Sequence, residues 1–401
     1  MSHAAVVCHP LRSPVGRYGG VLRTVEPADL AAQVVGAVVK RSGLPSDAID
    51  EVVLGQCYPN SEAPAIGRVA ALNANLPAAV TGLQLDRRCG SGLQAVLYAA
   101  MMVQTGVSDV VLAGGTESMS QAEYYTMAMR WGARAENQVF YDRLARGRVT
   151  AGGVNYPVPG GMIETAENLR RDYGISREEQ DLLALASHQR AVAAQESGRF
   201  AEEIVPIELS AGGTVDRDEH PRADASLQAL SGLRPIRRKA DPDATVTAGN
   251  ASGQNDGAAV CIVASEEAAE RYGLRPLARV LGWSAVGVMP DRMGIGPVPA
   301  TERVLTRLGL RLADMDLIEL NEAFAAQVLA CTREWRIDAL TDDRLNPNGS
   351  GISLGHPVGA TGCRILTTLV RELDRRNARY GLETMCVGGG QGLAAVFERV
   401  A

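Results

Sequence analysis

The sequence is poor in aromatic residues, lacks long apolar runs and carries no excess of basic charge. Phenylalanine, tryptophan and tyrosine make up 4% of its 401 residues, so the core must be built from Ala, Val, Leu and Ile. Its 40 Lys and Arg are outnumbered by 46 acidic residues, which argues against binding to nucleic acid or to an anionic membrane surface. No apolar run approaches the roughly 20 residues that span a bilayer. We therefore expect no nucleic-acid partner and no membrane partner.

Paired cysteines and a targeting signal are missing as well. The seven cysteines are scattered, which favours a reducing compartment over a disulfide framework. The sequence contains no Cys-x-x-Cys pair or His/Cys cluster, so it predicts no metal site. The first residues contain no charged segment followed by a long apolar one, and we expect no secretory signal. The expected location is cytoplasmic.

Short apolar runs alternate with amphipathic segments along much of the chain. Residues 4–8, 49–55 and 109–113 indicate buried strands, and residues 27–41 carry apolar side chains at helical spacing. Strands that alternate with helices are typical of a mostly parallel sheet that helices cover. The sequence therefore predicts an α/β protein.

A diverged repeat divides the chain. Residues 48–56 resemble residues 315–322, and residues 109–115 resemble residues 383–389. Such a repeat predicts two similar halves related by a pseudo-twofold axis. The polar, Pro-containing sequence between them indicates an insertion that lies over the sheet. We expect three parts, namely an N-terminal half of residues 1–120 plus 251–276, an inserted loop domain of residues 121–250 and a C-terminal half of residues 277–401.

A cysteine stands directly before a strongly apolar segment. Cys89 is followed by Gly-Ser-Gly and then by residues 93–103, in which Gln94 is the polar exception. A helix that is apolar on all sides is a buried one. The free N–H groups at the N-terminus of such a helix favour the thiolate of a cysteine over its thiol. Cys89 is therefore a candidate nucleophile, and a core cysteine is the alternative.

Three further segments carry candidate chemistry. Asn321 follows an apolar run, and His356 lies in a Gly/Pro-rich turn before an amphipathic helix, where a histidine can titrate near neutral pH. Cys386 precedes three glycines that begin at Gly388 and lack the spacing of a nucleotide-phosphate loop. The alternatives are a helix cap for Asn321, a surface turn for His356 and a packed strand cysteine for Cys386.

Taken together and in their order, these segments resemble the thiolase family. The matching motifs are Cys-Gly-Ser-Gly from Cys89, Asn-Glu-Ala-Phe from Asn321, Gly-His-Pro-Val-Gly-Ala-Thr-Gly around His356 and Cys-Val-Gly-Gly-Gly-Gln-Gly from Cys386, with further matches at 113–120 and 247–257. The resemblance covers essentially the whole chain. It implies the thiolase fold, in which two similar β/α halves related by a pseudo-twofold axis give a layered α-β-α-β-α core with an inserted loop domain.

The resemblance implies a role for each catalytic candidate. Cys89 would become acylated, His356 would accept its proton, and Cys386 would remove a proton from a second CoA thioester. One oxyanion hole would consist of His356 and a water held by Asn321, and the other of the backbone N–H groups of Cys89 and Gly388. The resemblance also implies substrate contacts by Met162, Arg222, Leu233, Ala248, Ser252, Gly253, Met293 and Phe324.

The implied activity is that of an acetyl-CoA C-acetyltransferase, with CoA as substrate and product and no permanently bound cofactor. A broader 3-ketoacyl-CoA thiolase of β-oxidation would use the same residues and is the alternative. Asp86, Gly161 and Ile163 depart from the family pattern, and this leaves the acyl-chain specificity open. A catalytically silent, lipid-binding scaffold is a third hypothesis, against which the retention of all four catalytic side chains speaks. The family also implies a homo-oligomer, a tetramer made of two dimers.

Overall fold

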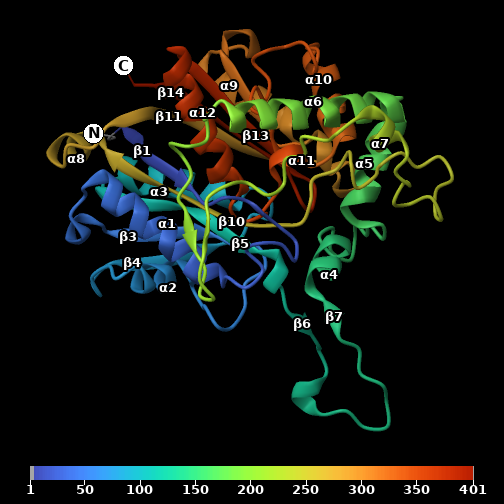
Figure 1. Cartoon of the computed structure of the whole chain (residues 1–401), viewed down its shortest axis with the longest axis horizontal. Coiled ribbons are helices and arrows are strands. Elements are labelled where there is room, and N and C mark those ends of the chain that lie inside the picture. Colours follow the sequence, from blue (N-terminus) through green and yellow to red (C-terminus); the bar gives the residue numbers. More distant parts are fainter. Residues whose placement is uncertain (1–3, 401) are drawn as a thin grey trace.

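Two sets of strands meet at the centre of the molecule (Figure 1). The computed structural model describes residues 4–400. In the first half of the fold the strands are β1 (Ala5–Arg12), β2 (Gly16–Arg17), β3 (Glu51–Gly55), β4 (Thr81–Leu85), β5 (Val110–Ser118) and β10 (Asn255–Ser265). In the second half they are β11 (Pro276–Gly287), β12 (Leu317–Leu320), β13 (Tyr380–Val387) and β14 (Gln391–Arg399).

The two halves share one strand topology. β3 and β5 are parallel, and β5, β10 and β1 follow in antiparallel pairs. In the second half β12 and β13 are parallel, and β13, β14 and β11 follow in antiparallel pairs. β1 and β11 pair with each other and join the halves, where Val6 faces Arg279. The repeat predicted from the sequence is therefore confirmed.

Helices cover both outer faces and fill the space between the halves. α3 (Ser91–Gln104) and α12 (Thr361–Arg376) share one buried cluster with strands of both halves. One outer face carries α1 (Pro27–Ser42), α2 (Ile66–Asn73) and α8 (Glu266–Arg271). The other carries α9 (Pro297–Leu308) and α10 (Ala325–Trp335). The order α-β-α-β-α is the layering that the family resemblance implies.

The two central helices approach each other closely at their N-termini. A Cβ at Gly92 of α3 would lie 2.9 Å from the backbone nitrogen of Cys363 in α12. A Cβ at Gly362 would in turn collide with the backbone of Leu93. Glycine at both positions lets the helix ends touch. The loops that precede α3 and α12 are thereby brought together, and these loops contain Cys89 and His356.

The segment between β5 and β10 packs mainly on the second half. Its helices are α4 (Arg143–Val149), α5 (Gly161–Asp172), α6 (Arg177–Glu196) and α7 (Leu227–Ser231). α5 and α6 contact α10, and α6 also contacts α11 (Gly351–Leu354). A capping box opens α6, with Ser176 bonded to Glu179. β8 (Ile207–Glu208) and β9 (Thr214–Val215) form a short hairpin in the same segment.

An arm leaves the body of the molecule within this segment. It runs out after β6 (Tyr124–Tyr125) and returns at β7 (Tyr141–Asp142), as the lower right of Figure 1 shows. The domain limits at residues 120, 250 and 276 stay a prediction. None of the helices within residues 4–400 is both long and apolar enough to cross a membrane.

Candidate active site

A cavity of about 350 Å³ opens between the loops before α3 and α12, the end of β13 and the inserted segment. Predicted site residues that line it are Cys89, Met162, Ala248, Ser252, Gly253, Met293, Phe324, His356 and Gly388. Cys386 and Asn321 are not among the lining residues and have no exposed surface; Cys386 packs in one cluster with the lining residues Met293 and Phe324, and Asn321 precedes the lining residue Ala323 by two positions. Arg222 and Leu233 are not among the lining residues. Leu233 instead lies over Gly249, and the backbone N–H of Arg222 contacts His188.

The turn before α3 holds Cys89 at the cavity wall. Ser91 Oγ accepts a hydrogen bond from the backbone N–H of Arg87 (2.8 Å) and donates one to the carbonyl of Arg88 (2.7 Å). Arg88 adopts a φ of +46°, a left-handed conformation that an arginine rarely takes. Such a strained backbone conformation persists only where the surrounding structure holds it in place, and here it stands directly before the candidate nucleophile. Gly90 is the N-cap of α3, so Cys89 lies just ahead of the helix.

Burial, more than the helix end, sets the protonation of Cys89. Burial raises the pKa of its thiol, and the Arg88 guanidinium together with the backbone N–H groups of Gly388 and Cys89 only partly opposes this. The backbone N–H groups do favour the thiolate, as expected, but burial outweighs them in the resting protein. The thiol therefore needs a base to remove its proton. The backbone N–H groups of Gly388 and Cys89 nevertheless reach the Cys89 sulfur.

Cys386 stands at the end of β13, two residues before Gly388. Burial, and then the nearby charge of Cys89, raise the pKa of its thiol well above the ordinary value. Its apolar neighbours include Met293, Phe324 and Met162. Cys386 is thus a neutral thiol at rest beside the cavity, and electrostatic coupling joins it to Cys89.

His356 is held in one tautomer. Its Nδ1 lies 2.6 Å from Oγ1 of Thr361, and that hydroxyl donates to the carbonyl of Pro357 at 2.9 Å. Since the hydroxyl proton is already used, the Nδ1–H of His356 must be the donor. Its backbone N–H also donates to Oδ1 of Asn255 at 2.9 Å.

The second ring nitrogen of His356 is free to act as a base. Nε2 is buried and has no hydrogen-bond partner among the described residues. Burial, followed by the charges of Arg364 and Arg148, lowers the pKa of His356 to about 3. A neutral imidazole with an unprotonated nitrogen therefore faces the cavity. The surface-turn alternative for this histidine is wrong, because its exposed fraction is 6%.

Asn321 is fully buried, yet Oδ1 and Nδ2 of its side chain have no partner among the described residues. It follows β12, as predicted, and its backbone N–H donates to the carbonyl of Thr384 at 3.0 Å. The helix-cap alternative is wrong, since α10 begins at Ala325 with Phe324 as its N-cap. A buried amide without partners is costly and indicates a group prepared for a ligand or a water.

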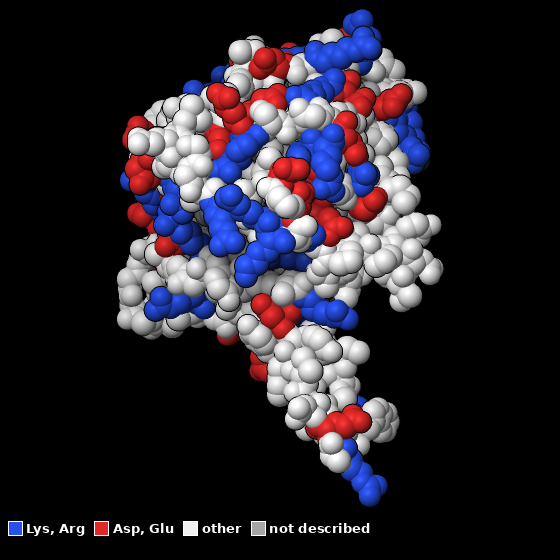
Figure 2. All heavy atoms as spheres, turned by 90° about the vertical axis from the view of Figure 1, so that its right-hand side faces the viewer, with Lys and Arg blue, Asp and Glu red and all other residues white. Residues whose placement is uncertain are grey.

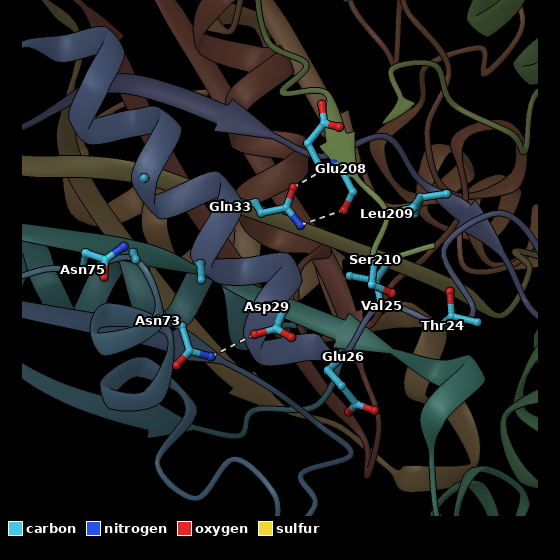
Figure 3. A pocket seen from close by; sticks show the side chains of 13 residues that line it. Thr24, Val25, Glu26, Asp29, Gln33, Asn73, Asn75, Glu208, Leu209 and Ser210 are labelled. Carbon is cyan, nitrogen blue, oxygen red and sulfur yellow. Dashed lines mark hydrogen bonds between the residues drawn. The ribbon is translucent and has the colours of Figure 1, made fainter. Parts of the chain in front are cut away.

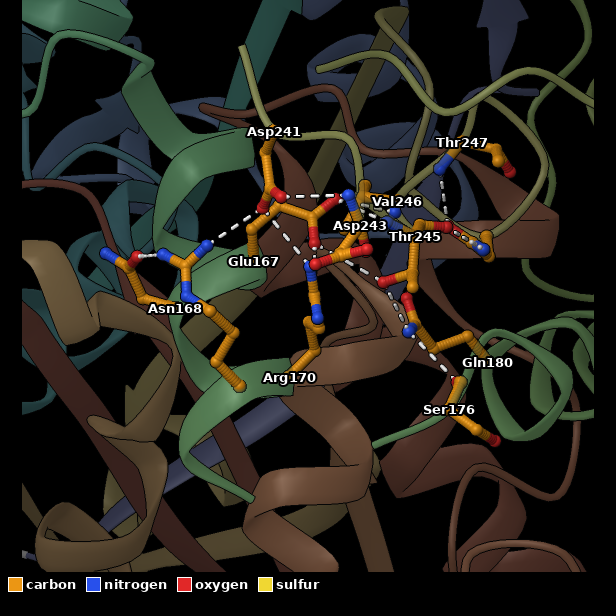
Figure 4. Close-up of polar contacts among 12 residues, drawn as sticks. Glu167, Asn168, Arg170, Ser176, Gln180, Asp241, Asp243, Thr245, Val246 and Thr247 are labelled. Atoms are coloured by element: carbon orange, nitrogen blue, oxygen red, sulfur yellow. Dashed lines mark hydrogen bonds and ion pairs between the residues drawn. The ribbon is translucent and has the colours of Figure 1, made fainter. Parts of the chain in front are cut away.

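A polar network that the sequence analysis missed supports one wall of the cavity (Figure 4). Glu167 of α5 accepts hydrogen bonds from the backbone N–H groups of Thr245 (2.9 Å) and Val246 (2.8 Å). Arg170 pairs with Glu167 at 3.0 Å and with Asp241 at 3.2 Å. This network holds the chain just before the lining residues that begin at position 248. The motif matches gave no signal for it, because the partners are far apart in sequence.

A second missed residue, Glu117, ties two cavity loops together. Its Oε2 accepts the backbone N–H groups of Cys57 and Gly359, each at 2.9 Å, and its Oε1 accepts that of Tyr58 at 3.2 Å. Burial raises the pKa of Glu117 to about 7. The glutamate within the motif at residues 113–120 was the signal that could have found it. Other lining residues that were missed are Tyr58, Arg88, Met119, Arg148, Ile236 and Gln254.

A larger hollow of about 530 Å³ lies beside α1 (Figure 3) and shares no lining residue with the cavity at Cys89. Its polar side chains bond mainly to one another or to nearby backbone. Gln33 pairs with the backbone of Glu208, and Asn73 donates to Asp29 at 2.9 Å. Its lining contains no cysteine or histidine. The arrangement supplies no nucleophile and base pair, so the cavity at Cys89 is the candidate active site.

Comparisons with known proteins agree with this geometry. The profile described as "Thiolase, N-terminal domain" matches residues 5–267, and "Thiolase, C-terminal domain" matches residues 274–399. The chain therefore belongs to the thiolase family, whose members are acyltransferases that use CoA thioesters. It is itself an acyltransferase.

Individual relatives are similar over their full length. A β-ketothiolase of Cupriavidus necator is 45% identical, and a β-ketoadipyl-CoA thiolase of Pseudomonas aeruginosa is 46% identical, each with 100% of both chains covered. The crystal structure of the Bacillus anthracis acetyl-CoA acetyltransferase matches with a TM-score of 0.94 and 45% identity, over 100% of this chain and 99% of that one. The fold predicted from the motifs is thus confirmed.

Proposed function

We propose that this protein is an acetyl-CoA C-acetyltransferase, which condenses two molecules of acetyl-CoA to acetoacetyl-CoA and catalyses the reverse thiolysis through an acyl group on Cys89. The observation that carries the proposal is the convergence of three groups on one cavity. These are the Cys89 thiol, the unprotonated Nε2 of His356 and the Cys386 thiol.

The first step transfers an acetyl group to Cys89. Nε2 of His356 takes the thiol proton, the sulfur attacks the thioester carbon, and the bond to the CoA sulfur breaks. The backbone N–H groups of Cys89 and Gly388 stabilise the oxyanion, and each such donor is worth about 3 kcal/mol of barrier. The departing CoA thiolate takes the proton of Cys386. Cys386 is then a thiolate whose raised pKa makes it a strong base.

The second step forms the carbon–carbon bond. The Cys386 thiolate removes a proton from the methyl group of a second acetyl-CoA, and the resulting carbanion attacks the acyl carbon on Cys89. The bond from this carbon to sulfur breaks, and the sulfur recovers its proton from His356. His356 and a water held by the unpartnered amide of Asn321 stabilise the enolate oxygen. All three groups return to their starting protonation.

CoA would reach the cavity over a basic face of the molecule. Figure 2 shows Lys and Arg side chains gathered on the face that forms the right-hand side of Figure 1. Ile236 lines the cavity, and Arg234, Arg238 and Lys239 beside it are exposed. Such charges suit the phosphates of CoA. Contacts of Arg222 and Leu233 with the nucleotide are part of the same proposal.

A broader 3-ketoacyl-CoA thiolase is the second candidate. The name of one relative, a β-ketoadipyl-CoA thiolase, favours an acyl group longer than acetyl. The catalytic groups are the same for both candidates, so they differ only in how the cavity accepts the acyl chain.

We further propose a homotetramer made of two dimers, working in the cytoplasm. The arm between β6 and β7 supports an assembly, because it exposes large apolar side chains that a partner surface would cover, namely Tyr124, Met127, Trp131, Val139 and Phe140. The seven free cysteines support a reducing compartment.

The acyl-enzyme step gives the direct test. The protein is incubated with acetyl-CoA, digested, and the acetyl group is located by mass spectrometry. We expect label on Cys89, none in Cys89→Ala, and unchanged label in the matched control Cys331→Ala, whose thiol is buried in α10. Label that persists in Cys89→Ala would contradict the proposal.

A further inference from the structure

Two arginines line the same wall of the cavity. The guanidinium of Arg88 lies over the ring of Tyr58, with 5.2 Å between its carbon and the ring centroid. Arg148 follows Gly147 in α4, and a Cβ at Gly147 would lie 3.4 Å from the Tyr58 ring and 3.0 Å from Nη2 of Arg88. The charges of both arginines act on the Tyr58 hydroxyl. Tyr58, Arg88, Gly147 and Arg148, here called the cationic wall, therefore form one unit beside Cys89.

The charge of the cationic wall is largely uncompensated. Arg88 contacts Asp86 at 3.4 Å, but the carboxylate side chain is 41% exposed and water weakens the pair. Arg148 donates to the side-chain carbonyl of Gln254, at 3.2 Å from Nη1 and 2.5 Å from Nη2, when that amide is oriented to accept. No carboxylate within residues 4–400 pairs with Arg148. Asp86 is thus the one carboxylate within residues 4–400 that forms an ion pair with either arginine, and two arginines so weakly paired in one cavity indicate a site for an anion.

Tyr58 adds a donor to the cationic wall. Its oxygen accepts from Nη2 of Arg88 at 3.5 Å, and its own proton is donated to no described residue. Burial raises the pKa of Tyr58 to about 12, so the proton stays in place at neutral pH. A carboxylate beside Tyr58 would meet two guanidinium groups and one hydroxyl.

The proposed acetyl transfer does not use this wall. Its oxyanions are held by backbone N–H groups and by His356 with Asn321, and the CoA phosphates belong to the basic stretch at residues 234–239. Other lining residues of the cavity are apolar, among them Met162, Ile163, Met293 and Phe324. An anion at the wall therefore has to come from the acyl part of the substrate.

We propose that Arg88, Arg148 and Tyr58 bind a carboxylate at the far end of the acyl chain, so that the preferred substrates are 3-oxoacyl-CoA esters of dicarboxylic acids. This inference rests on the proposed thiolysis through Cys89, names the substrate class, and favours the broader 3-ketoacyl-CoA candidate over acetoacetyl-CoA. A methyl-ended chain leaves both guanidinium charges without a counter-ion in the closed cavity, whereas a carboxylate-ended chain pairs with them.

The test compares thiolysis of two six-carbon substrates, 3-oxoadipyl-CoA and 3-oxohexanoyl-CoA, with pairs one carbon shorter and longer. We expect a kcat/KM at least about tenfold higher for the carboxylate member of the best pair, since a charge-assisted contact is worth that much. Arg148→Gln should remove most of this preference. The preference is the ratio of kcat/KM for the two substrates within one variant, so a general loss of turnover cancels. Arg146→Gln is the matched control, because Arg146 of the same helix lies over Tyr141, at 5.3 Å from its ring centroid.

The outcomes separate this inference from the proposed function. Equal kcat/KM values, or a preference for the methyl-ended chain at every length, would overturn the carboxylate site while leaving the thiolase reaction standing. Absence of thiolysis with every substrate would overturn the proposed function itself. If Arg148→Gln does not fold, the ratio in the unmodified protein still decides, and Arg148→Lys, which keeps the charge, should retain part of the preference. A preference that is the same in Arg148→Gln as in the unmodified protein would overturn the assignment to these residues.

Discussion

The hydroxyl of Thr361 fixes the tautomer of His356. Its oxygen lies 2.6 Å from Nδ1 of His356, and its own proton is donated to the carbonyl of Pro357. Nε2 is consequently left unprotonated and without a partner. A single hydroxyl on the first turn of α12 thus prepares the base that Cys89 requires, given that burial keeps the Cys89 thiol protonated.

Thr361→Val should lower kcat/KM for thiolysis about 10-fold to 100-fold, a part of what a general base contributes. Without the acceptor at Nδ1, the imidazole loses its fixed orientation and tautomer. Thr367→Val is the matched control, because Thr367 is also buried in α12 and donates to the carbonyl four residues earlier at 2.8 Å. Both variants should lose about 1 kcal/mol of unfolding free energy. Equal kinetics in the two variants would show that the Thr361 hydroxyl has no role beyond packing.

The sequence alone predicted the fold well, because the fold depends on local patterns. The helix at Pro27–Ser42 follows from periodicity, and the repeat of β3 in β12 follows from similarity within a short window. These elements need no knowledge of distant contacts. The meeting of Cys89, His356 and Gly388 at one cavity was instead implied by the resemblance of their motifs to the thiolase family.

Other features of the site could not be predicted because they arise from contacts between distant segments. The protonation of Cys89 depends on burial by the whole fold, which outweighs the helix end considered at first. Glu117 accepts hydrogen bonds from the backbone N–H groups of Cys57 and Gly359. The charges of Arg88 and Arg148 both act on Tyr58. In each case only the tertiary structure brings the loops together. The motif at residues 113–120 contains Glu117, but a single sequence contains no local signal for the distant segments with which it pairs.

Asn321→Leu should separate activity from stability. Its amide has no partner to lose, so we expect the free energy of unfolding to stay the same or rise. Thiolysis should fall about 100-fold, because the water at one oxyanion site is lost. The control is Asn348→Leu, in a buried asparagine that contacts Arg199 at 2.8 Å and Glu372 at 3.2 Å and should lose about 1–3 kcal/mol. Chemical denaturation measures the free energy of unfolding of both variants, and steady-state kinetics measures their thiolysis. A strongly destabilised Asn321→Leu would show that its amide has structural partners.

The rate at which Cys89 is alkylated should rise with pH as expected for a thiol whose pKa is raised. An ordinary cysteine has a pKa of about 8.5, and burial raises the pKa of the Cys89 thiol. A raised pKa means that thiolate accumulates only at higher pH, so the rate with iodoacetamide should still be climbing above about pH 8.5. The rate is followed for the Cys89 peptide by mass spectrometry, so the other cysteines do not interfere. A plateau below about pH 7 would instead indicate a resting thiolate and restore the helix-end interpretation.

The last prediction separates the two cysteines of the cavity. If Cys386 is the base at the α-carbon, it is needed to make and break the carbon–carbon bond but not to acylate Cys89. Cys386→Ser should therefore lose thiolysis and condensation by about 100-fold or more, since a serine hydroxyl cannot act as the thiolate does. It should still accept an acetyl group from acetyl-CoA, at a reduced rate because the leaving CoA thiolate loses its proton donor.

Cys89→Ser should lose both the acylation and the complete reaction, which makes it the counterpart of Cys386→Ser. Single-turnover acylation and steady-state thiolysis are measured on both, with thermal melts to confirm folding. If Cys386 were only a packed strand cysteine, serine of similar size would cost a little stability in its buried, apolar surroundings and leave turnover nearly normal. Near-normal thiolysis by a folded Cys386→Ser protein would therefore refute the two-cysteine mechanism. Loss of carbon–carbon chemistry with retained acylation is the result that only a base at Cys386 produces.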